Sequence, residues 1–311
     1  MKALMKIHSL VAVLVLPIAC ATPAAAPLNP DQRGFATTNE AADALVDAVA
    51  RWDVPAIVGI VGKDGEDLVA SADTAGDRAR ANAFVAKARE KRVIVSDPTN
   101  ADYAWMTIGN QDWPVPIPLV QDHGKWYFDG AAGHDEILKR RIGENELDTL
   151  TILRGFAEAQ QAYAAEPHDG ATTRQYAQKL VSSPGKQDGL AWRNIDGTWG
   201  GPIGDTVAKG IEEGYAKRGA PFHGYYFKVL KGQGDAARLG KLDYVTDGAM
   251  IGGFALLAWP AEYGVTGVQT FIVSYDDVVY QKDIGPRTAS LAPSIERYDP
   301  DASWKRTEDE W

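Results

Sequence analysis

Between residues 38 and 91 the apolar positions recur with the spacing of helices. In residues 41–52 (AADALVDAVARW) the apolar side chains fall on one helical face: Ala42, Leu45, Val46 and Val49. The polar run Thr38-Asn39-Glu40 supplies an N-cap for this helix. A second, shorter helix is expected to begin at Asp53, and residues 77–91 again have helical composition. The pattern therefore predicts that this part of the chain forms three helices.

The next stretches have the short, β-rich composition of strands, with polar turns between them. Four strands are expected: Arg92–Ser96, Tyr103–Ile108, Val115–Val120 and Lys125–Phe128. Helices followed by a curved antiparallel sheet that ends in W-Y-F-D-G (126–130) resemble the cone-shaped NTF2-like fold. The resemblance implies a first domain over residues 34–131, and folds of this kind host binding modules as readily as enzymes.

The second part of the chain begins with a long helical stretch and ends in strands. Residues 132–165 are expected to form two helical segments that meet near Gly143, and shorter helices are expected at 173–181 and 203–217. Four strands follow: Phe222–Leu230, Gly253–Pro260, Gln269–Ser274 and Val278–Lys282. Because hairpin-sized connections forbid parallel crossovers, these strands are expected to pair antiparallel, and the chain is assigned to the α+β class.

A helix ending in AQQAYAAE (159–166), followed by strands such as GYYFKV and TFIVSYDDVVYQKD, is similar to the globular head of pseudopilins. In pseudopilins this helix continues an apolar, membrane-spanning half. Here residues 137–153 carry charged side chains: Lys139, Arg140, Arg141, Glu144, Glu146 and Asp148. A helix with these charges cannot be buried in lipid. The resemblance therefore implies a pseudopilin-like shape for residues 132–311, without assembly into a filament.

The first twenty residues have the pattern of an export signal. Lys2 and Lys6 form a positive start, and the apolar run at 10–19 (LVAVLVLPIA) is too short to span a membrane as a helix. Ala19-Cys20 resembles a bacterial lipobox, in which Cys20 would be lipidated; ordinary cleavage after an A-x-A pattern is the alternative. Residues 21–33, rich in Ala and Pro, are interpreted as a tether. The pattern predicts an exported protein, either periplasmic or lipid-anchored in the cell envelope.

Composition and charge exclude several classes of function. The formal net charge is −10, from 42 acidic and 32 basic residues, which disfavours binding to nucleic acid or to anionic lipid. Cys20 is the only cysteine, so neither an intramolecular disulfide nor a cysteine-based metal site can form. The run His134-Asp135-Glu136 points in three directions on a helix and cannot converge on one ion. No metal and no cofactor are therefore expected.

Several long stretches are together typical of one bacterial family. They are RIGENELDTL (141–150), AQQAYAAE (159–166), YAQKLVSSPGKQDGLAW (176–192), FHGYYFKVLKGQG (222–234), GGFALLAWPAEYG (252–264), TFIVSYDDVVYQKDIGP (270–286) and YDPDASW (298–304). On these stretches the chain is identified as a member of DUF2950, a family of uncharacterised exported proteins. The resemblance covers nearly all of the chain after the export signal. Because the family has no established activity, it implies no reaction.

The densest group of turn and polar residues is SSPGKQDG (182–189). It has neither the G-x-S-x-G pattern of a nucleophile elbow nor the Gly-Lys-Ser/Thr pattern of a phosphate loop, so its simplest interpretation is a turn. Loops nevertheless carry function that a scaffold positions, and aromatic residues beside them can contact a protein or stack on a sugar. The candidate binding residues are therefore Ser183, Lys186, Asp188, Trp192 and Trp199.

Three functions fit these features. The favoured one is a non-catalytic envelope protein that binds a protein or a glycan. The first alternative is a hydrolase-like enzyme with a pocket formed by His223, Asp188 and Lys186, which would have to converge on one reacting centre. The second alternative is a small-ligand carrier that uses a cavity of the first domain near Trp105 and Trp126.

Overall fold

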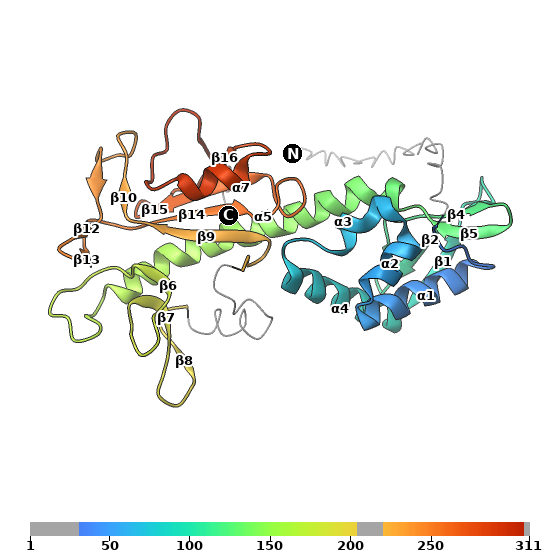
Figure 1. The fold of residues 1–311 in the computed structure, drawn as a ribbon, viewed down its shortest axis with the longest axis horizontal. Helices are drawn as coiled ribbons and strands as arrows, with labels where there is room; N and C mark the ends of the chain where they lie inside the picture. The colour runs from blue at the N-terminus through green and yellow to red at the C-terminus, as the bar shows by residue number, and fades with distance from the viewer. Residues whose placement is uncertain (1–30, 204–219, 308–311) are drawn as a thin grey trace, which may run out of the picture.

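A computed structural model describes residues 31–203 and 220–307 and confirms the α+β class (Figure 1). The buried apolar side chains form two clusters. One gathers residues from Phe35 to Phe128, and the other gathers residues from Leu150 to Tyr298. We call them the front cluster and the rear cluster. The NTF2-like and pseudopilin-like resemblances stay predictions, as does the boundary at 131/132, which falls inside the helix that joins the clusters.

The front helices begin at the side-chain caps that their sequences supply. They are α1 (Thr38–Arg51), α2 (Val54–Val61), the 3-10 turn η1 (Lys63–Gly65), α3 (Glu66–Val69) and α4 (Thr74–Glu90). The N-cap of α1 is Thr37, one residue before the polar run expected to provide it, while Asp53 caps α2 as expected. Asp73 caps α4, which therefore begins three residues earlier than its composition indicates.

These helices pack against one face of the front sheet. Its strands are β1 (Arg92–Ser96), β2 (Tyr103–Ile108), β3 (Trp113–Pro114), β4 (Leu119–Asp122) and β5 (Lys125–Phe128). They pair antiparallel in the order β1-β2-β4-β5, with β3 beside β2. Phe35 closes the β5 edge, because it exchanges two backbone hydrogen bonds with Trp126 (2.9 and 2.8 Å). The strand expected over 115–120 forms only from Leu119 onward.

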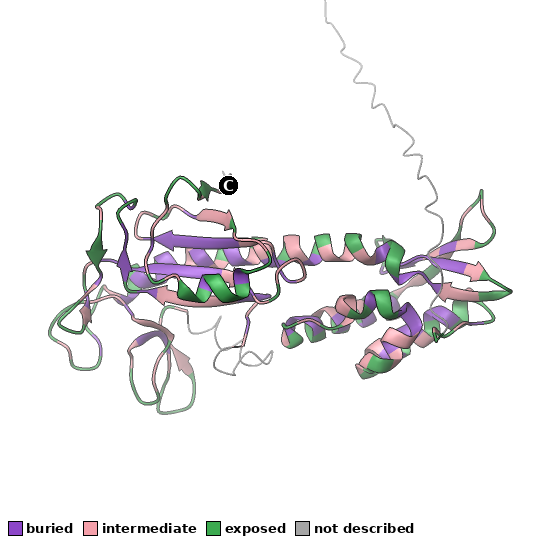
Figure 2. Ribbon diagram, turned by 45° about the horizontal axis from the view of Figure 1, so that its top comes forward, coloured by how far each residue is buried: buried purple, intermediate pink, exposed green. Residues whose placement is uncertain are grey.

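A single helix, α5 (Gly130–Tyr163), runs from the front cluster to the rear cluster (Figure 1). The predicted break near Gly143 is wrong. Glycine in a helix interior costs only about 1 kcal/mol, and packing of both ends of α5 outweighs this cost. Most charged side chains of the stretch between the clusters are exposed or half-buried (Figure 2), and the buried exception, Arg141, is hydrogen-bonded to two backbone carbonyls, so charge is tolerated there.

The rear sheet packs on the second half of α5. Its strands pair antiparallel in the order β17-β16-β15-β14-β9 and comprise β9 (Tyr225–Leu230), β14 (Ala255–Pro260), β15 (Gln269–Ser274), β16 (Tyr280–Asp283) and β17 (Lys305–Arg306). Two small hairpins extend it: β10 (Gly232–Gln233) with β11 (Leu242–Asp243), and β12 (Val245–Thr246) with β13 (Ala249–Met250). A short helical segment, α7 (Thr288–Leu291) and η3 (Ala292–Ser294), precedes β17.

Two expected helices have different outcomes. The helix expected over 173–181 is wrong, because the backbone groups of Ala177 bond the side chain of Gln160 on α5 (2.8 and 2.9 Å) and a strand, β6 (Lys179–Val181), follows. The helix expected over 203–217 falls almost wholly on residues outside the described ranges. No helix in residues 31–203 and 220–307 is both long and apolar enough to cross a membrane.

Polar contacts join the front helices to the rear loops. Asp73 is fully buried, and one carboxylate oxygen accepts the N–H of Gly76 (3.0 Å) while the other accepts the N–H of Gly224 (2.8 Å). The backbone N–H of Ala72 donates to Glu262 (3.3 Å). Gly224 has a φ of 74°, and a side chain there would collide with Asn145 of α5, so only glycine fits. The two halves of the protein are thus fastened by hydrogen bonds from backbone N–H groups to carboxylate side chains as well as by α5.

A second set of contacts fastens α3 to α5. Arg141 is buried and donates to the carbonyl oxygens of Asp67 (2.8 Å) and Leu68 (2.6 Å), the positions where a cation stabilises a helix C-terminus. His134, two turns earlier on α5, places its Nε2 2.9 Å from the carboxylate of Asp67 and its Nδ1 3.2 Å from that of Asp135. The short α3 is therefore held by one permanent charge and one titratable group.

The His134 contact predicts a pH-dependent contribution to stability. The hydrogen bond to Asp67 raises the pKa of His134, against the opposing effect of burial, so the folded protein binds its proton more tightly than the unfolded chain. The stabilisation is fully present below the unfolded pKa of about 6.5 and is lost as the pH rises through the folded pKa. We expect His134→Asn to be most destabilising near pH 5.5 and least destabilising near pH 8.5, in urea unfolding at about these two values.

His123 supplies the control: its side chain is 94% exposed on a turn of the front sheet, and solvent screens its 3.7 Å contact with Asp122. The effect of His123→Asn on the free energy of unfolding is expected to differ far less between the two pH values than the effect of His134→Asn. An effect of His134→Asn that is the same at both pH values, or larger at the higher one, would contradict this account.

Candidate functional site

The candidate binding residues gather in one small unit of the rear half, residues 179–200. It contains β6, β7 (Gly189–Arg193) and β8 (Trp199–Gly200). β6 pairs with β7 in parallel, with Lys179 opposite Gly189 and Val181 opposite Ala191, and β7 pairs with β8 antiparallel. Only the loop 182–188 connects the two parallel strands, so this short connection needs local contacts to hold it.

Asp188 supplies these contacts. Its carboxylate accepts hydrogen bonds from the backbone N–H of Ser183 (2.7 Å), the Ser183 hydroxyl (3.1 Å) and the Lys179 ammonium (2.8 Å). Burial alone would raise the pKa of Asp188, but the hydrogen bonds from Lys179 and Ser183 outweigh it and lower that pKa. Asp188 is therefore an ionised clamp that closes the loop.

Gln187 fastens the same loop to the end of α5. Its backbone N–H donates to both carboxylate oxygens of Asp169 (2.8 and 2.9 Å), and its carbonyl oxygen accepts the hydroxyl of Tyr163. His168 stacks on the ring of Tyr163, with centroids 3.9 Å apart, and reaches the Gln187 side chain at 3.3 Å. Burial and the nearby carboxylates raise the pKa of Tyr163 to about 12, so its hydroxyl stays a donor. The loop is rigidly placed.

Ser183 and Lys179 are as close as a catalytic nucleophile and its base, but Lys179 lacks the buried environment that a lysine base needs. Their Oγ and Nζ atoms are 2.6 Å apart. A lysine that serves as a base is normally made neutral by burial, whereas the side chain of Lys179 is 42% exposed and ion-paired with Asp188. The backbone N–H of Ser183, which an oxyanion would need, is also occupied by Asp188. The arrangement holds a loop and does not form a catalytic centre.

Trp192 is a packing residue. It belongs to the edge of the rear cluster, and its ring lies 6.4 Å from Tyr163 and 5.5 Å from His168. A side chain at Gly200, the last residue of β8, or at Gly201, just after it, would meet the indole at 2.7 and 2.9 Å. The sequence predicted that Trp192 contacts a partner; the structure shows it half-buried against the rear cluster, and the partner contact stays a prediction.

Trp199 belongs to the hairpin 193–199, which projects from the rear half. The guanidinium of Arg193 lies 4.1 Å from the centre of its ring and also donates to the carbonyl of Gly197 (2.5 Å). Asn194 and Thr198 close the turn: the backbone N–H of Asn194 donates to the Thr198 carbonyl, and the Asn194 side-chain amide donates to the Thr198 hydroxyl. The N–H and hydroxyl of Thr198 both donate to the carboxylate of Asp196. The end of the hairpin is thus held by hydrogen bonds within the hairpin itself.

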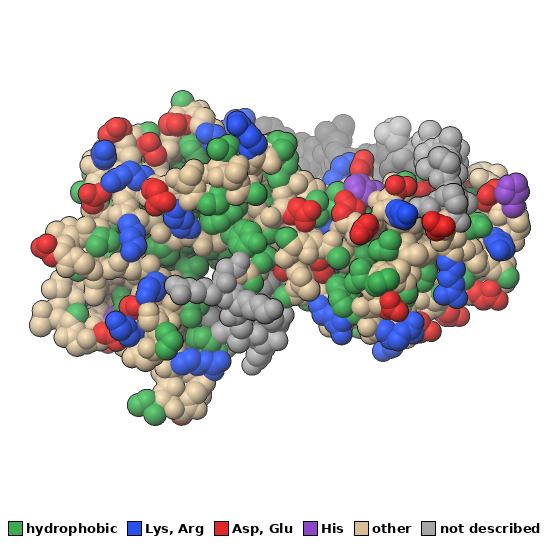
Figure 3. Space-filling model, in the orientation of Figure 1, with side chains coloured by type: hydrophobic (Ala, Val, Ile, Leu, Met, Phe, Trp, Pro, Cys, Tyr) green, Lys and Arg blue, Asp and Glu red, His purple; other side chains and the backbone are tan. Residues whose placement is uncertain are grey.

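The most exposed large apolar side chain of the described residues lies at the end of this hairpin. Ile195 is fully exposed, whereas the next most exposed large apolar side chain, Leu239, is 63% exposed. Figure 3 shows the β7–β8 connection as a projection with a hydrophobic side chain at its end. Ile195 is not among the residues predicted from the sequence. The signal that could have found it is the pattern N-I-D-G-T, an apolar residue inside an Asn-Asp-Gly turn.

The predicted pocket of His223, Asp188 and Lys186 does not form. His223 Nδ1 lies 2.7 Å from the carboxylate of Asp148, midway along α5, whereas the Asp188 loop is bonded to Tyr163 at the end of that helix. Positions 148 and 163 of a helix are roughly 22 Å apart along its axis. The side chain of Lys186 is exposed on the loop. The three groups therefore cannot act on one reacting centre.

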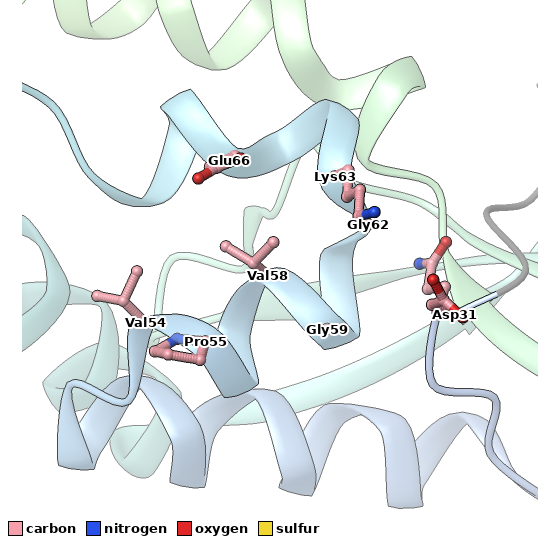
Figure 4. Close-up of a pocket in the computed structure, with 9 residues that line it drawn as sticks. Asp31, Val54, Pro55, Val58, Gly59, Gly62, Lys63 and Glu66 are labelled. Atoms are coloured by element: carbon pink, nitrogen blue, oxygen red, sulfur yellow. The ribbon is translucent and has the colours of Figure 1, made fainter.

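The front half does contain a hollow, but not beside Trp105 and Trp126. The described hollow has a volume of about 460 Å³ and is lined by Asp31, Gln32, Val54, Pro55, Val58, Gly59, Gly62, Lys63 and Glu66 (Figure 4). Trp105 lies on β2 with Tyr103 against its edge, and Trp126 packs on the front cluster. The hollow includes neither tryptophan, and a ligand cavity at Trp105 and Trp126 stays a prediction.

The fold and this unit define an α+β protein with two apolar clusters on one helix and an ordered surface hairpin. Within residues 31–203 and 220–307, no group of three or more His, Cys, Asp and Glu side chains could hold a metal ion. The chain belongs to DUF2950, described as "Protein of unknown function (DUF2950)", which matches residues 32–307. No curated protein and no solved structure matches the chain.

Proposed function

We propose that this protein is an exported, non-catalytic component of the bacterial envelope that binds a protein partner through the hairpin 193–199. The observation that carries the proposal is Ile195, a fully exposed apolar side chain on a turn that its own hydrogen bonds hold in place. Exposing it to water has no benefit for folding. Binding would bury it without the entropy cost of ordering a loop, which is what makes a preorganised contact effective.

The flanking residues favour a protein over a glycan. Arg193 and Trp199 lie next to Ile195 and are of the residue types enriched in protein-binding hot spots. A sugar ring would instead need an open aromatic face, and Arg193 covers one face of Trp199 while Trp192 is packed in the rear cluster. The ionised clamp of Asp188 and Lys179 supports the hairpin from β6 and β7 and supplies no reaction.

The proposed location rests on the sequence of residues 1–20, which lie outside the described residues. The positive start, the short apolar run and the Ala19-Cys20 pattern support export, with Cys20 as a lipid anchor. An anchor at Cys20, followed by the Ala- and Pro-rich residues 21–33, would hold the folded part close to the membrane and leave the hairpin open to neighbouring proteins.

Affinity purification after crosslinking in intact cells tests the binding role. We expect the tagged protein to recover a reproducible partner, and Ile195→Asp to weaken that interaction at least about tenfold, because the loss of a central contact costs more than 1 kcal/mol. Since Ile195 touches no core residue, the variant should unfold within about 0.5 kcal/mol of the parent protein.

Leu239→Asp is the matched control, since it places the same charge at another exposed leucine or isoleucine position of the rear half. It should leave the recovery unchanged. A partner that Ile195→Asp recovers as well as the parent protein does would contradict the proposed role of the hairpin.

A further inference from the structure

The two edges of the front sheet differ. The β5 edge is closed by Phe35, which pairs with Trp126. At the other edge, β1 pairs with β2 alone, in an unbroken register from Arg92 to Ser96. Between Val93 and Ser96 this strand has no proline, no bulge and no charged side chain, which are the features that normally protect an edge strand.

The register shows which backbone groups of β1 point away from the sheet. Just beyond the strand ends, the N–H of Asp97 donates to Tyr103 and the carbonyl of Lys91 accepts from Gly109. Hydrogen-bonded positions alternate along an antiparallel pair. Odd-numbered residues of β1 therefore bond β2, and the N–H and C=O groups of Arg92, Ile94 and Ser96 point outward. Within the described residues, no hydrogen bond to these outward groups is seen.

The outward groups form a self-complementary set. If a second β1 lies antiparallel with Ile94 opposite Ile94, Arg92 lies opposite Ser96, so outward groups meet outward groups along the whole strand. Val93 then lies opposite Val95. Val93 is 40% exposed in the single chain, and β-branched residues facing each other across strands stabilise a sheet.

Charges at the strand ends match the same register. Lys91 would lie opposite Asp97 of the second copy, at both ends of the paired strands. The hydrogen bonds that Asp97 accepts from Thr99 and Asn100 all use its Oδ1 atom, so Oδ2 takes no part in holding that turn. The Lys91 side chain is 41% exposed and lies beside Asp112 of its own chain. A strand shifted by two residues would lose both lysine–aspartate pairs.

We propose that two copies of this chain associate through β1, antiparallel and centred on Ile94, to form one continuous sheet across a two-fold axis. The contact is isologous, as closed dimers require, because the same residues serve in both copies. Strand pairing alone buries little area, so the dimer belongs to the weak, transient class of interfaces. The hairpin 193–199 lies in the other half of the chain and takes no part, so this inference is independent of the proposed function.

Sedimentation over a concentration series tests the association, using purified protein with Cys20→Ser so that no native thiol remains. We expect a reversible monomer–dimer equilibrium. Ser96→Pro should raise the dissociation constant at least about tenfold, because proline removes an outward N–H at both ends of the strand pair. Since that N–H does not bond β2, thermal unfolding of the monomer should be nearly unchanged.

Disulfide trapping tests the register in the same Cys20→Ser background. Val93 and Val95 of opposite copies form a non-hydrogen-bonded pair, whose Cα separation of about 4.5 Å suits a disulfide. An equimolar mixture of Val93→Cys and Val95→Cys proteins should therefore give the cross-linked dimer several-fold faster than either variant alone. A monomer at every concentration, a dimer unaffected by Ser96→Pro, or equal cross-linking by the mixture and the single variants would each overturn the proposal.

Discussion

Replacing Asp73 with alanine is expected to lower the free energy of unfolding by about 2–4 kcal/mol, since it removes a helix cap and leaves a buried N–H of the other half without its acceptor. One oxygen of this fully buried carboxylate caps α4 at Gly76, and the other accepts from Gly224, 151 positions away. The loss of the cap alone costs about 1 kcal/mol. The rest of the effect measures the contact between the two halves.

Asp53→Ala separates these two contributions. Asp53 caps α2 through the N–H of Ala56 in the same way, but its carboxylate is at the surface. It should lower the free energy of unfolding by about 1 kcal/mol. Urea unfolding of both variants gives the comparison. If Asp73→Ala costs no more than Asp53→Ala, the bond to Gly224 does not hold the two halves together.

Leu153→Ala is expected to cost about 3–5 kcal/mol, because it opens a cavity in a core that cannot fully collapse. Leu153 lies on the second half of α5, is fully buried, and belongs to the rear cluster. Truncating its side chain removes packing contacts between α5 and the rest of the rear cluster.

Leu147→Ala is the matched control on the same helix. Leu147 is 53% exposed, in the stretch of α5 between the two clusters, so the same change should stay within about 0.5 kcal/mol of the parent protein. Equal effects of the two substitutions in urea unfolding would mean that α5 does not pack on the rear sheet as described.

Elements with local signals could be predicted from the sequence. The expected bounds of β1, β2, β5 and β15 agree with the structure residue for residue, because a polar turn borders each of them on at least one side. The Gly143 break was wrong because tertiary packing at both ends decides whether α5 continues. The helix expected over 173–181 was wrong because Gln160, seventeen positions away, takes up the backbone of Ala177.

In the candidate site, too, local features could be predicted from the sequence and long-range contacts could not. The loop 182–188 could be recognised from its turn composition, and Asp188 is indeed its organising residue. The partner of His223 could not be recognised, because Asp148 lies 75 positions away on α5. Nor does periodicity distinguish a tryptophan packed between elements, such as Trp192, from one at the surface. The turn pattern around Ile195 could be read from the sequence, whereas its full exposure is seen only in the folded hairpin.

Membership of DUF2950 places the chain in a family to which no reaction is assigned. The groups with catalytic side chains are fastened in structural roles: Asp188 and Lys179 to a loop, and His223 to α5. What the rear half offers to solvent is an ordered hairpin with an apolar end. The proposed binding role rests on this hairpin.

The most direct test places a photoactivatable cross-linking residue at position 195 in living cells, and at position 239 as the control. The account predicts a discrete cross-linked protein that appears with the probe at Ile195 and is absent with the probe at Leu239, two positions that are both well exposed. No cross-linked product at position 195 under any growth condition, or the same products at both positions, would contradict the account.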